Sequence, residues 1–413
     1  MNATPWERLL ISSNNPVVAL SDSPEFTGVS SDSPVFALVA GEASGDTLGA
    51  ELILSLKKRF PTARFLGIGG PKMLAEGMES WYPMERLSVM GLFEVLKVLP
   101  GLLKLRKELI QRLLDVQPTA FIGVDAPDFN FRVEAAMKAA KIPAIHYVGP
   151  SVWAWREKRL LKIKRWVDGV LVLFPFELPL YEKYGIPAKF VGHPLANQVP
   201  ETPNRTAARK ALGLPEAVPV TGLLPGSRSS EINLLIDVYV QAAVILHGMY
   251  PQMKFVIPCV NDKAKQRIQQ SLNDFGQGLD VRLIDQQAQL AMAASDQLIV
   301  TSGTATLEAA LMKRPLVLAI KLHPITHWIM RRLATTQWIG LPNVLAQKTI
   351  VPEFIQDEAT PQQIALGLAK LISDQTMRDA QLTEFSAQYH QLKQNASELA
   401  ADAIVEWAGL EAE

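Results

Sequence analysis

Residues 123–130 read Gly-Val-Asp-Ala-Pro-Asp-Phe-Asn and directly follow a short apolar run. Such a run is typical of a buried parallel strand, so Asp125 should lie at the carboxyl end of that strand. A carboxylate in that place can take the proton of a substrate hydroxyl, and burial raises its pKa toward neutrality. Asp128 is the competing base, although its place before a helix favours a capping role. Asp125 could itself be a cap or a member of a structural salt bridge.

A second segment, residues 224–231, reads Leu-Pro-Gly-Ser-Arg-Ser-Ser-Glu and leads from an apolar run into a helix. Helix starts leave backbone N–H groups without partners, and these groups bind phosphate well. The backbone at Gly226, the Ser227 hydroxyl and the Arg228 guanidinium could therefore converge on one phosphate. The alternative is a capping box, in which serine and glutamate support the helix start. The two interpretations are compatible.

A third segment, residues 301–308, reads Thr-Ser-Gly-Thr-Ala-Thr-Leu-Glu and has the same setting. Ser302, Gly303 and Thr304 suit a second phosphate contact, and Glu308 lies one helical turn further on, where it could bind ribose hydroxyls. The alternative is a well-capped helix with Glu308 near its positive end. Two such turns in one half of the chain predict a nucleoside diphosphate that lies along two helix starts.

A fourth segment, residues 41–49, reads Gly-Glu-Ala-Ser-Gly-Asp-Thr-Leu-Gly. Its spacing differs from the dinucleotide-binding glycine pattern. Acidic side chains would repel a pyrophosphate, but Glu42, Ser44 and Asp46 could bind sugar hydroxyls. The alternative is a tight turn in which Asp46 caps the following helix.

These segments need a scaffold that gathers strand ends. Apolar runs predict strands at 35–40, 65–68, 120–124, 144–148, 170–174, 218–224, 254–257, 281–284, 297–301 and 316–320. Helices are expected between them, among others at 47–60, 102–116 and 132–141. This alternation predicts an α/β fold of two Rossmann-like, doubly wound domains that face a cleft.

Prolines at 194, 200, 203 and 215 mark a boundary between the two domains. We expect a flexible tail at 1–34, an acceptor- and membrane-facing domain at 35–195 and a nucleotide-sugar domain at 196–360. Amphipathic helices at 361–413 should pack on the first domain or on a partner subunit.

Composition narrows the function classes. The chain has 413 residues, of which 48% are hydrophobic and 20% charged, so it can bury a core and is not disordered as a whole. Lys plus Arg and Asp plus Glu both number 41, which argues against a general nucleic-acid binder. A single cysteine, Cys259, excludes an internal disulfide and a cysteine-rich zinc site. We find no run of about 18 uncharged apolar residues that would span a membrane.

Two segments combine apolar and basic residues. Residues 89–105 include Met90, Leu92, Phe93 and Leu96, with lysines and an arginine among and after them. Residues 153–165 include Trp153 and Trp155 together with Arg156, Lys158, Arg159, Lys162, Lys164 and Arg165. Together they could lie on an anionic membrane surface. The alternative is two core helices with solvated basic faces.

In these segments the sequence resembles the lipid-A-disaccharide synthases, inverting glycosyltransferases of family 19 in bacterial outer-membrane lipid synthesis. The matching strings run in order along the chain at 38–46, 89–91, 123–130, 150–156, 191–193, 224–228, 302–304 and 341–343. The Ser-Val-Trp-Ala-Trp string at 151–155 is specific, whereas the Gly-Thr and Gly-Ser-Arg turns alone are not. Gly149 stands where the pattern has a small polar residue.

The resemblance implies two GT-B domains and a defined reaction. A 2,3-diacylglucosamine would pass from UDP to the 6-hydroxyl of 2,3-diacylglucosamine 1-phosphate, forming a β-1,6 tetraacyl disaccharide 1-phosphate and UDP. Asp125 would be the base, Arg228 would contact the nucleotide sugar, and Asn343 would lie near the same cleft. The resemblance also implies an enzyme without metal or cofactor, peripheral on the cytoplasmic membrane's inner face, that dimerises through its C-terminal segments.

Two other functions remain open from the residues. One is another GT-B UDP-sugar enzyme, an epimerase or a cell-wall glycosyltransferase, whose nucleotide half would look the same. The other is a non-catalytic, lipid-binding scaffold. The apolar segment at 89–105 and the string at 151–155 favour a lipid acceptor over the first, and Asp125, Arg228, Glu308 and Asn343 argue against the second.

Overall fold

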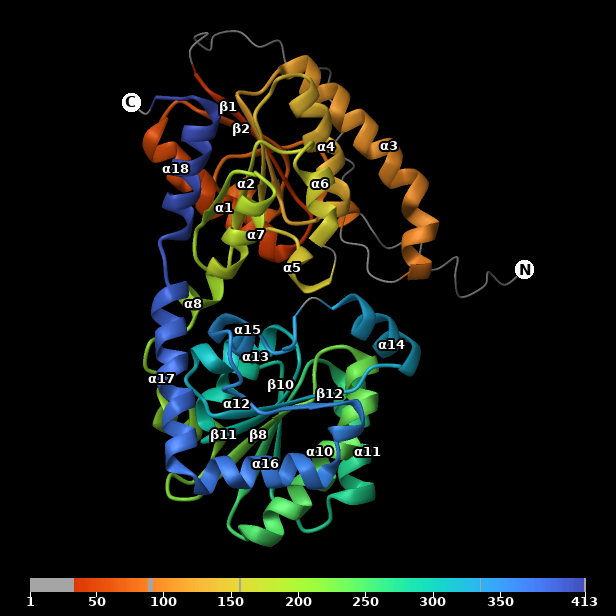
Figure 1. The fold of residues 1–413 in the computed structure, drawn as a ribbon, viewed down its shortest axis with the longest axis vertical. Helices are drawn as coiled ribbons and strands as arrows, with labels where there is room; N and C mark the ends of the chain where they lie inside the picture. Colours follow the sequence, from red (N-terminus) through yellow and green to blue (C-terminus); the bar gives the residue numbers. More distant parts are fainter. Residues whose placement is uncertain (1–32, 88–91, 156, 335, 412–413) are drawn as a thin grey trace, which may run out of the picture. The chain divides into compact units, whose positions relative to one another are not determined.

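The computed structural model describes residues 33–87, 92–155, 157–334 and 336–411. Two all-parallel sheets organise this part of the chain (Figure 1). The first has the order β3-β2-β1-β4-β5-β6-β7, with β1 Val35–Ala40, β2 Arg64–Ile68, β3 Glu79–Ser80, β4 Ala120–Val124, β5 Ala144–Tyr147, β6 Gly169–Val172 and β7 Ala188–Phe190. The second has the order β10-β9-β8-β11-β12-β13, with β8 Val220–Leu224, β9 Lys254–Cys259, β10 Val281–Asp285, β11 Gln297–Thr301, β12 Leu316–Ile320 and β13 Glu353–Ile355.

The strand order of each sheet reverses at one point, between β1 and β4 in the first and between β8 and β11 in the second. At each reversal point the two following connections leave toward opposite faces of the sheet and open a crevice, which is where doubly wound sheets bind ligands. The predicted α/β class with two Rossmann-like doubly wound sheets is confirmed.

Helices fill the crossovers. Around the first sheet they are α1 Ala43–Arg59, α2 Pro71–Ala75, α3 Leu92–Val116, α4 Pro127–Ala139, α5 Val152–Trp155, α6 Leu160–Ile163 and α7 Leu178–Lys183. In the rest of the chain they are α8 Pro194–Gln198, α9 Arg205–Leu212, α10 Ser229–Met249, α11 Asp262–Phe275, α12 Ala288–Ala294, α13 Thr304–Leu311, α14 Pro324–Leu333, α15 Leu341–Ala346, α16 Pro361–Ser373, α17 Gln375–Leu392 and α18 Ala396–Ala408.

Most predicted strands are present within two residues of their expected ends, but several helices begin earlier than expected. Helix α1 begins at Ala43 rather than 47, and α4 begins at Pro127 rather than 132. The turn residues themselves thus form the first helical turn, with Pro127 at a position where its missing N–H costs nothing. Helix α3 begins ten residues before its expected start and contains Pro100. The short strands β3, β7 and β13 were not predicted, because two or three residues are too few to show a pattern.

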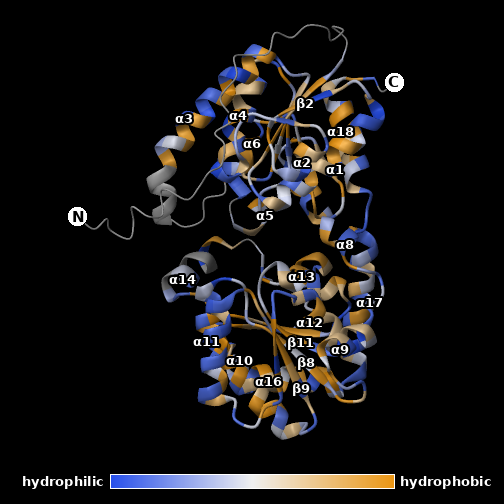
Figure 2. Ribbon diagram, turned by 180° about the vertical axis from the view of Figure 1, so that it is seen from behind, coloured by the Kyte–Doolittle hydropathy of each residue, from blue (hydrophilic) through white to orange (hydrophobic). Residues whose placement is uncertain are grey.

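The central strands of both sheets are buried and mostly apolar (Figure 2), whereas β3, β7, β10 and β13 are only partly buried. Helix α3 packs Leu105, Leu109 and Leu113, spaced four residues apart, into the core of the first sheet. This burial supports the core-helix interpretation for the C-terminal half of α3.

One described helix, α10, is long and apolar enough to cross a membrane by length and composition. Half of its apolar window is buried within the protein, and Leu235, Ile236 and Tyr239 lie in the core of the second sheet. The core helix of an α/β sheet passes the same test, so the length of α10 is explained by its place in the fold.

The last two helices serve different sheets. Helix α17 packs on α13, α15 and α16, whereas α18 packs on α1 (Figure 1). Glu398 of α18 forms ion pairs of 2.7 Å with both Lys58 and Arg59, which lower the pKa of Glu398 to about 2. On the same side, a Cβ at Gly169 would lie 2.2 Å from the ring of Trp407. The end of the chain is therefore fitted closely to the first sheet.

Candidate functional site

The turns after β8 and β11 line one pocket of about 640 Å³ at the carboxyl ends of their strands. The predicted residues Gly226, Ser227, Arg228, Ser302, Gly303, Thr304 and Glu308 all contribute to it. Pro258, Cys259 and Val260 from the end of β9, together with Gln286 and Ala288, complete the wall. Sequence reasoning missed these five, although the end of a strand beside β8 was a signal for them.

The turn between β11 and α13 leaves its helix start open. Gly303 is the N-cap with a φ of 148°, and no side chain caps the helix. A φ of this size is in the region that favours glycine. The first N–H groups of α13 are therefore available to an anion in the pocket.

In the turn between β8 and α10, the carboxylate of Glu231 binds groups at the start of the helix. One carboxylate oxygen of Glu231 accepts hydrogen bonds from the N–H groups of Ser227 and Arg228, each at 3.2 Å. The other oxygen lies 2.8 Å from Nη1 of Arg228. The glutamate half of the predicted capping box is thus present, but the N-cap is Arg228 rather than a serine. The carboxylate occupies two of the N–H groups that a phosphate would use.

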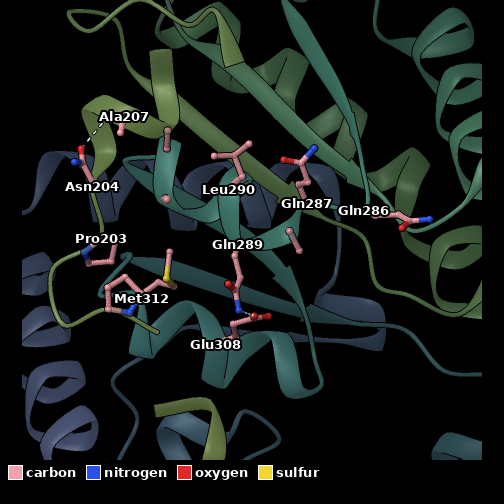
Figure 3. A pocket seen from close by; sticks show the side chains of 13 residues that line it. Pro203, Asn204, Ala207, Gln286, Gln287, Gln289, Leu290, Glu308 and Met312 are labelled. Atoms are coloured by element: carbon pink, nitrogen blue, oxygen red, sulfur yellow. Dashed lines mark hydrogen bonds between the residues drawn. The ribbon is translucent and has the colours of Figure 1, made fainter. Parts of the chain in front are cut away.

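A second pocket, of about 720 Å³, adjoins the first (Figure 3). Gln286, Ala288 and Glu308 line both. Pro203, Asn204, Leu290 and Met312 add to its wall, and Nε2 of Gln289 donates to Oε1 of Glu308 at 2.8 Å (Figure 3). Glu308 therefore stands at the junction of the two pockets.

Asp125 lies in a strained turn at the reversal point of the first sheet. Asp125 and Ala126 have φ values of 53° and 45°, left-handed conformations that L residues rarely adopt. The Asp125 N–H donates to the carbonyl of Tyr147 at 2.8 Å. Nδ2 of the fully buried Asn130 donates to the Asp125 carbonyl at 2.8 Å and to the Val39 carbonyl of β1 at 3.2 Å.

The half-buried carboxylate of Asp125 has no hydrogen-bond or ionic partner within the described ranges. Asp128, the competing base, is 93% exposed and forms a 2.7 Å ion pair with Arg159. It lies in the first turn of α4, whose N-cap is Ala126, so the cap predicted at Asp128 is wrong. Of the two carboxylates, Asp125 is the one left available.

The segment after β1 divides into exposed and buried groups. Glu42 and Ser44 are exposed at the start of α1. Asp46 is buried, and its carboxylate accepts hydrogen bonds from the N–H groups of Gly70, Lys72 and Met73 at 2.9–3.0 Å. It therefore binds the start of α2. The alternative that we had considered, a cap on its own helix, is not what the structure shows. This arrangement gives Asp46 a structural role.

Asn343 is likewise engaged within the protein. Its side chain donates to the Val351 carbonyl and Oε1 of Glu353, each at 2.8 Å, and accepts from the N–H groups of Ile350 and Val351. It is fully buried and does not line either pocket. A contact with the nucleotide sugar stays a prediction, and it would require this network to open.

Two carboxyl groups near the first sheet are buried without a full set of partners. Glu134 lies 2.7 Å from Nδ1 of His146, both fully buried, and burial raises the pKa of Glu134. Burial also raises the pKa of Glu177 to about 8, although the Phe174 N–H donates to it. Oε1 of Glu177 and the hydroxyl of Tyr181 have no hydrogen-bond partner within the described part of the chain. No sequence pattern indicated these groups.

The residues predicted to touch a membrane are only partly visible. Met90 lies outside the described residues, and Leu92, Phe93 and Leu96 belong to α3, but only their backbone is described. Trp153 and Trp155 are half-buried in α5, with Trp153 edge-on to Phe176 at 5.0 Å between ring centres. Leu99 and Leu103 are exposed on α3, one turn apart.

Comparisons with known proteins fit this architecture. Residues 36–405 match the family described as lipid-A-disaccharide synthetase. The chain is 72% identical over 373 residues to a lipid-A-disaccharide synthase of Hydrogenovibrio crunogenus, covering 90% of this chain and 99% of that protein. It is 49% identical over 373 residues to the lipid-A-disaccharide synthase of Pseudomonas savastanoi pv. phaseolicola, covering 90% and 97%.

Solved structures with the same fold include a UDP-GlcNAc 2-epimerase from Neisseria meningitidis bound to UDP-GlcNAc. It has a TM-score of 0.59 at 16% identity and covers 90% of this chain and 100% of that one. The calicheamicin glycosyltransferase CalG4 has a TM-score of 0.55 at 15% identity, covering 91% and 98%. At these identities the likeness shows the GT-B fold alone.

Proposed function

Because the chain belongs to the lipid-A-disaccharide synthase family, we propose specific roles for the residues above in that family's reaction. The chain is a glycosyltransferase that moves 2,3-diacylglucosamine from UDP to the 6-hydroxyl of 2,3-diacylglucosamine 1-phosphate. The products are the β-1,6 tetraacyl disaccharide 1-phosphate and UDP. One observation carries the assignment of roles. The pocket at β8 and β11 gathers predicted nucleotide-binding residues, while the Asp125 carboxylate has no partner among the described residues.

The donor nucleotide occupies the two adjoining pockets. The open start of α13 and the Arg228 guanidinium bind the diphosphate, since both present donors to one pocket. Ser302 and Thr304 add hydroxyl contacts, and Glu308 accepts hydrogen bonds from the ribose. The pyrimidine base of the nucleotide then extends past Glu308 into the pocket of Figure 3, where amide side chains can form hydrogen bonds with its edge.

Asp125 is the general base for a single displacement. The acceptor 6-hydroxyl oxygen bonds to the anomeric carbon as the carbon–oxygen bond to UDP breaks and UDP keeps that electron pair. The hydroxyl proton passes to the Asp125 carboxylate. Arg228 and the α13 start stabilise the charge that develops on UDP. Since base and nucleotide site belong to different sheets, the reaction requires the two to come together.

The turn after β1 supplies contacts to a sugar ring. Ala40 and Val124 pair in register at the ends of β1 and β4, so the turns that follow them lie side by side. A Cβ at Gly41 would be 3.2 Å from that of Ala126. The exposed Glu42 and Ser44 therefore stand next to Asp125, where they can bind sugar hydroxyls.

The enzyme binds its lipid substrates at a membrane surface. Leu99 and Leu103 are exposed on α3 with the basic Lys104 and Lys107 beside them. Exposed Lys158, Lys162, Lys164 and Arg165 flank the exposed Leu161. We assign 35–195 to the acceptor- and membrane-facing half and 196–360 to the nucleotide half. The enzyme binds peripherally to the inner face of the cytoplasmic membrane.

The test is a coupled assay of UDP release from the purified protein, with UDP-diacylglucosamine as donor and diacylglucosamine 1-phosphate as acceptor. Release should require the acceptor and should be unchanged by a metal chelator. Release without an acceptor would favour an epimerase or hydrolase. Nucleotide binding without any release would favour a scaffold.

A further inference from the structure

We infer that Glu231 is a positioning residue that acts as an internal anion: it fills the phosphate-type turn after β8 and holds Arg228 ready for the nucleotide's diphosphate. This inference rests on the proposed function, because it takes the pocket at β8 and β11 as the nucleotide site. Neither the family resemblance nor the predicted nucleotide contacts assign a role to this glutamate.

The geometry shows a carboxylate where a phosphate would otherwise bind. Glu231 accepts from the Ser227 and Arg228 N–H groups and pairs with the Arg228 guanidinium, so three donors of the turn converge on it. These are the donor types that bind a phosphate at a helix start. Glu231 itself lines the pocket, so its charge faces the ligand side.

Gly226 has the conformation that this filling requires. Its φ is 103°, and a Cβ there would lie 2.6 Å from Oε2 of Glu231. The glycine therefore makes room for the protein's own carboxylate. We had expected the backbone at Gly226 to contact a phosphate.

Charge repulsion then gives the two turns different roles in binding the diphosphate. A carboxylate and a phosphate repel each other strongly at hydrogen-bond distance, so both cannot use the Ser227 and Arg228 N–H groups. The start of α13 has no capping side chain and lies in the same pocket. The diphosphate therefore binds at α13, and the first turn contributes only the Arg228 side chain.

The contact with Glu231 matters because little else fixes the position of the Arg228 side chain. Its side chain is 81% exposed, and Glu231 is its only ionic partner among the described residues. The 2.8 Å contact uses Nη1 and leaves the other guanidinium N–H groups to reach a phosphate. A long side chain that is held in place before binding loses less rotamer freedom when the nucleotide arrives.

The test is a double-mutant cycle on UDP affinity, measured by calorimetry on the full-length chain. Arg228→Ala should weaken binding about 10- to 100-fold, because a charged hydrogen bond to phosphate is lost. Glu231→Ala should weaken binding about 3- to 10-fold in the wild-type background. In the Arg228→Ala background it should change affinity less than about twofold, because Glu231 acts through Arg228.

Glu231→Gln separates the two contacts of the carboxylate. Its amide oxygen can still accept from the backbone, but it carries no charge for Arg228, so its loss should lie between those of wild type and Glu231→Ala. In kinetics the KM for the donor should rise while the KM for the acceptor stays unchanged. Inorganic phosphate should inhibit Glu231→Ala more than wild type, because it can enter the vacated turn.

Asp374→Ala is the matched control, since it removes a carboxylate that caps α17 through the Met377 N–H, away from the pocket. It should lower thermal stability without changing UDP affinity. Tighter UDP binding by Glu231→Ala would overturn the inference, because it would make Glu231 a competitor of the nucleotide. An equal loss in the Arg228→Ala background would also overturn it. If wild type itself binds no UDP, the proposed function fails instead.

Discussion

The reversal points of the two sheets have the same topology but differ in the residue types that adopt a positive φ. After β4, Asp125 and Ala126 adopt left-handed conformations without being glycine. After β8 and β11, the left-handed or extended positive-φ positions are Gly226 and Gly303. A turn that presents a reactive side chain cannot use glycine at that position, whereas a turn that presents backbone N–H groups can. The difference follows from which part of the residue carries the chemistry.

The strained turn costs about 1–3 kcal/mol for each such residue and persists only where its surroundings fix it. Asn130 supplies much of this restraint, because its amide joins the carbonyls of Asp125 and Val39. Gly41 and Gly45 let the neighbouring turn and helix approach closely, since a Cβ at either would be within 3.3 Å of a neighbouring Cβ. The turns of the second sheet need no comparable support.

The two halves also treat carboxylates differently. Around the second sheet, Asp296 pairs with Arg205 and Arg209, and Glu231 pairs with Arg228. Around the first, Glu134 and Glu177 are buried with raised pKa values and no cationic Lys or Arg partner in the described part. Buried carboxyl groups whose pKa is raised by burial therefore lie around the first sheet.

Asp125→Asn should have the largest effect and tests whether the turn after β4 supplies the base. The substitution keeps the shape of the side chain and removes the base. We expect kcat to fall about 10²- to 10⁴-fold, as for the loss of a general base. UDP affinity by calorimetry should be unchanged, because the nucleotide pocket belongs to the second sheet. Retained turnover would remove Asp125 from the mechanism.

Asn130→Ala tests whether the strained turn positions the base. Three carbonyls would lose a buried donor, and we expect kcat to fall about 10-fold or more, with a loss of about 1–3 kcal/mol in the free energy of unfolding. UDP affinity should again stay unchanged.

Gln381→Ala is the control for Asn130→Ala, since Gln381 is a buried amide that joins Leu316 and Ile350 in the second half. It should lower stability by a similar amount while the folded protein keeps its kcat. Equal loss of kcat in both variants would mean that Asn130 acts only through stability.

Glu177→Gln is expected to have the smallest effect on turnover, and its effect appears instead in the pH dependence of stability. Burial raises the folded pKa of Glu177 from 4.5 to about 8, so the folded state binds the extra proton between these values. Wild-type stability should therefore be highest with respect to this group below about pH 4.5 and should fall as the pH rises toward 8, by at most about 1.4 kcal/mol per pH unit. The melting temperature of Glu177→Gln minus that of wild type should therefore increase from pH 5 to pH 8.

Glu182→Gln, on an exposed position of α7, is the control for that measurement. Its melting temperature should follow wild type across the range. A gap that stays constant for Glu177→Gln would show that Glu177 does not carry the raised pKa.

Much of this protein could be predicted from local patterns. Short apolar runs located ten of the thirteen strands that the structure describes, because a strand buried on both faces must be apolar throughout. The glycine and serine turns identified residues that line the pocket proposed for the nucleotide, because carboxyl ends of parallel strands meet at one edge of a sheet. The edge strands β3, β7 and β13 were too short to leave such a pattern.

What sequence alone determined is the order of elements, the family and the segments in which chemistry is done, since these depend on neighbours along the chain. Only the tertiary structure decided which partner each polar group has. It assigned the Asp46 carboxylate to α2, enclosed Asn343 in a network with Glu353 and filled one phosphate-type turn with Glu231. It left the Asp125 carboxylate without a partner in the part of the chain that the structure describes. The physical reason is that a hydrogen bond is satisfied by whichever group packing brings within reach, and that group is often distant in sequence.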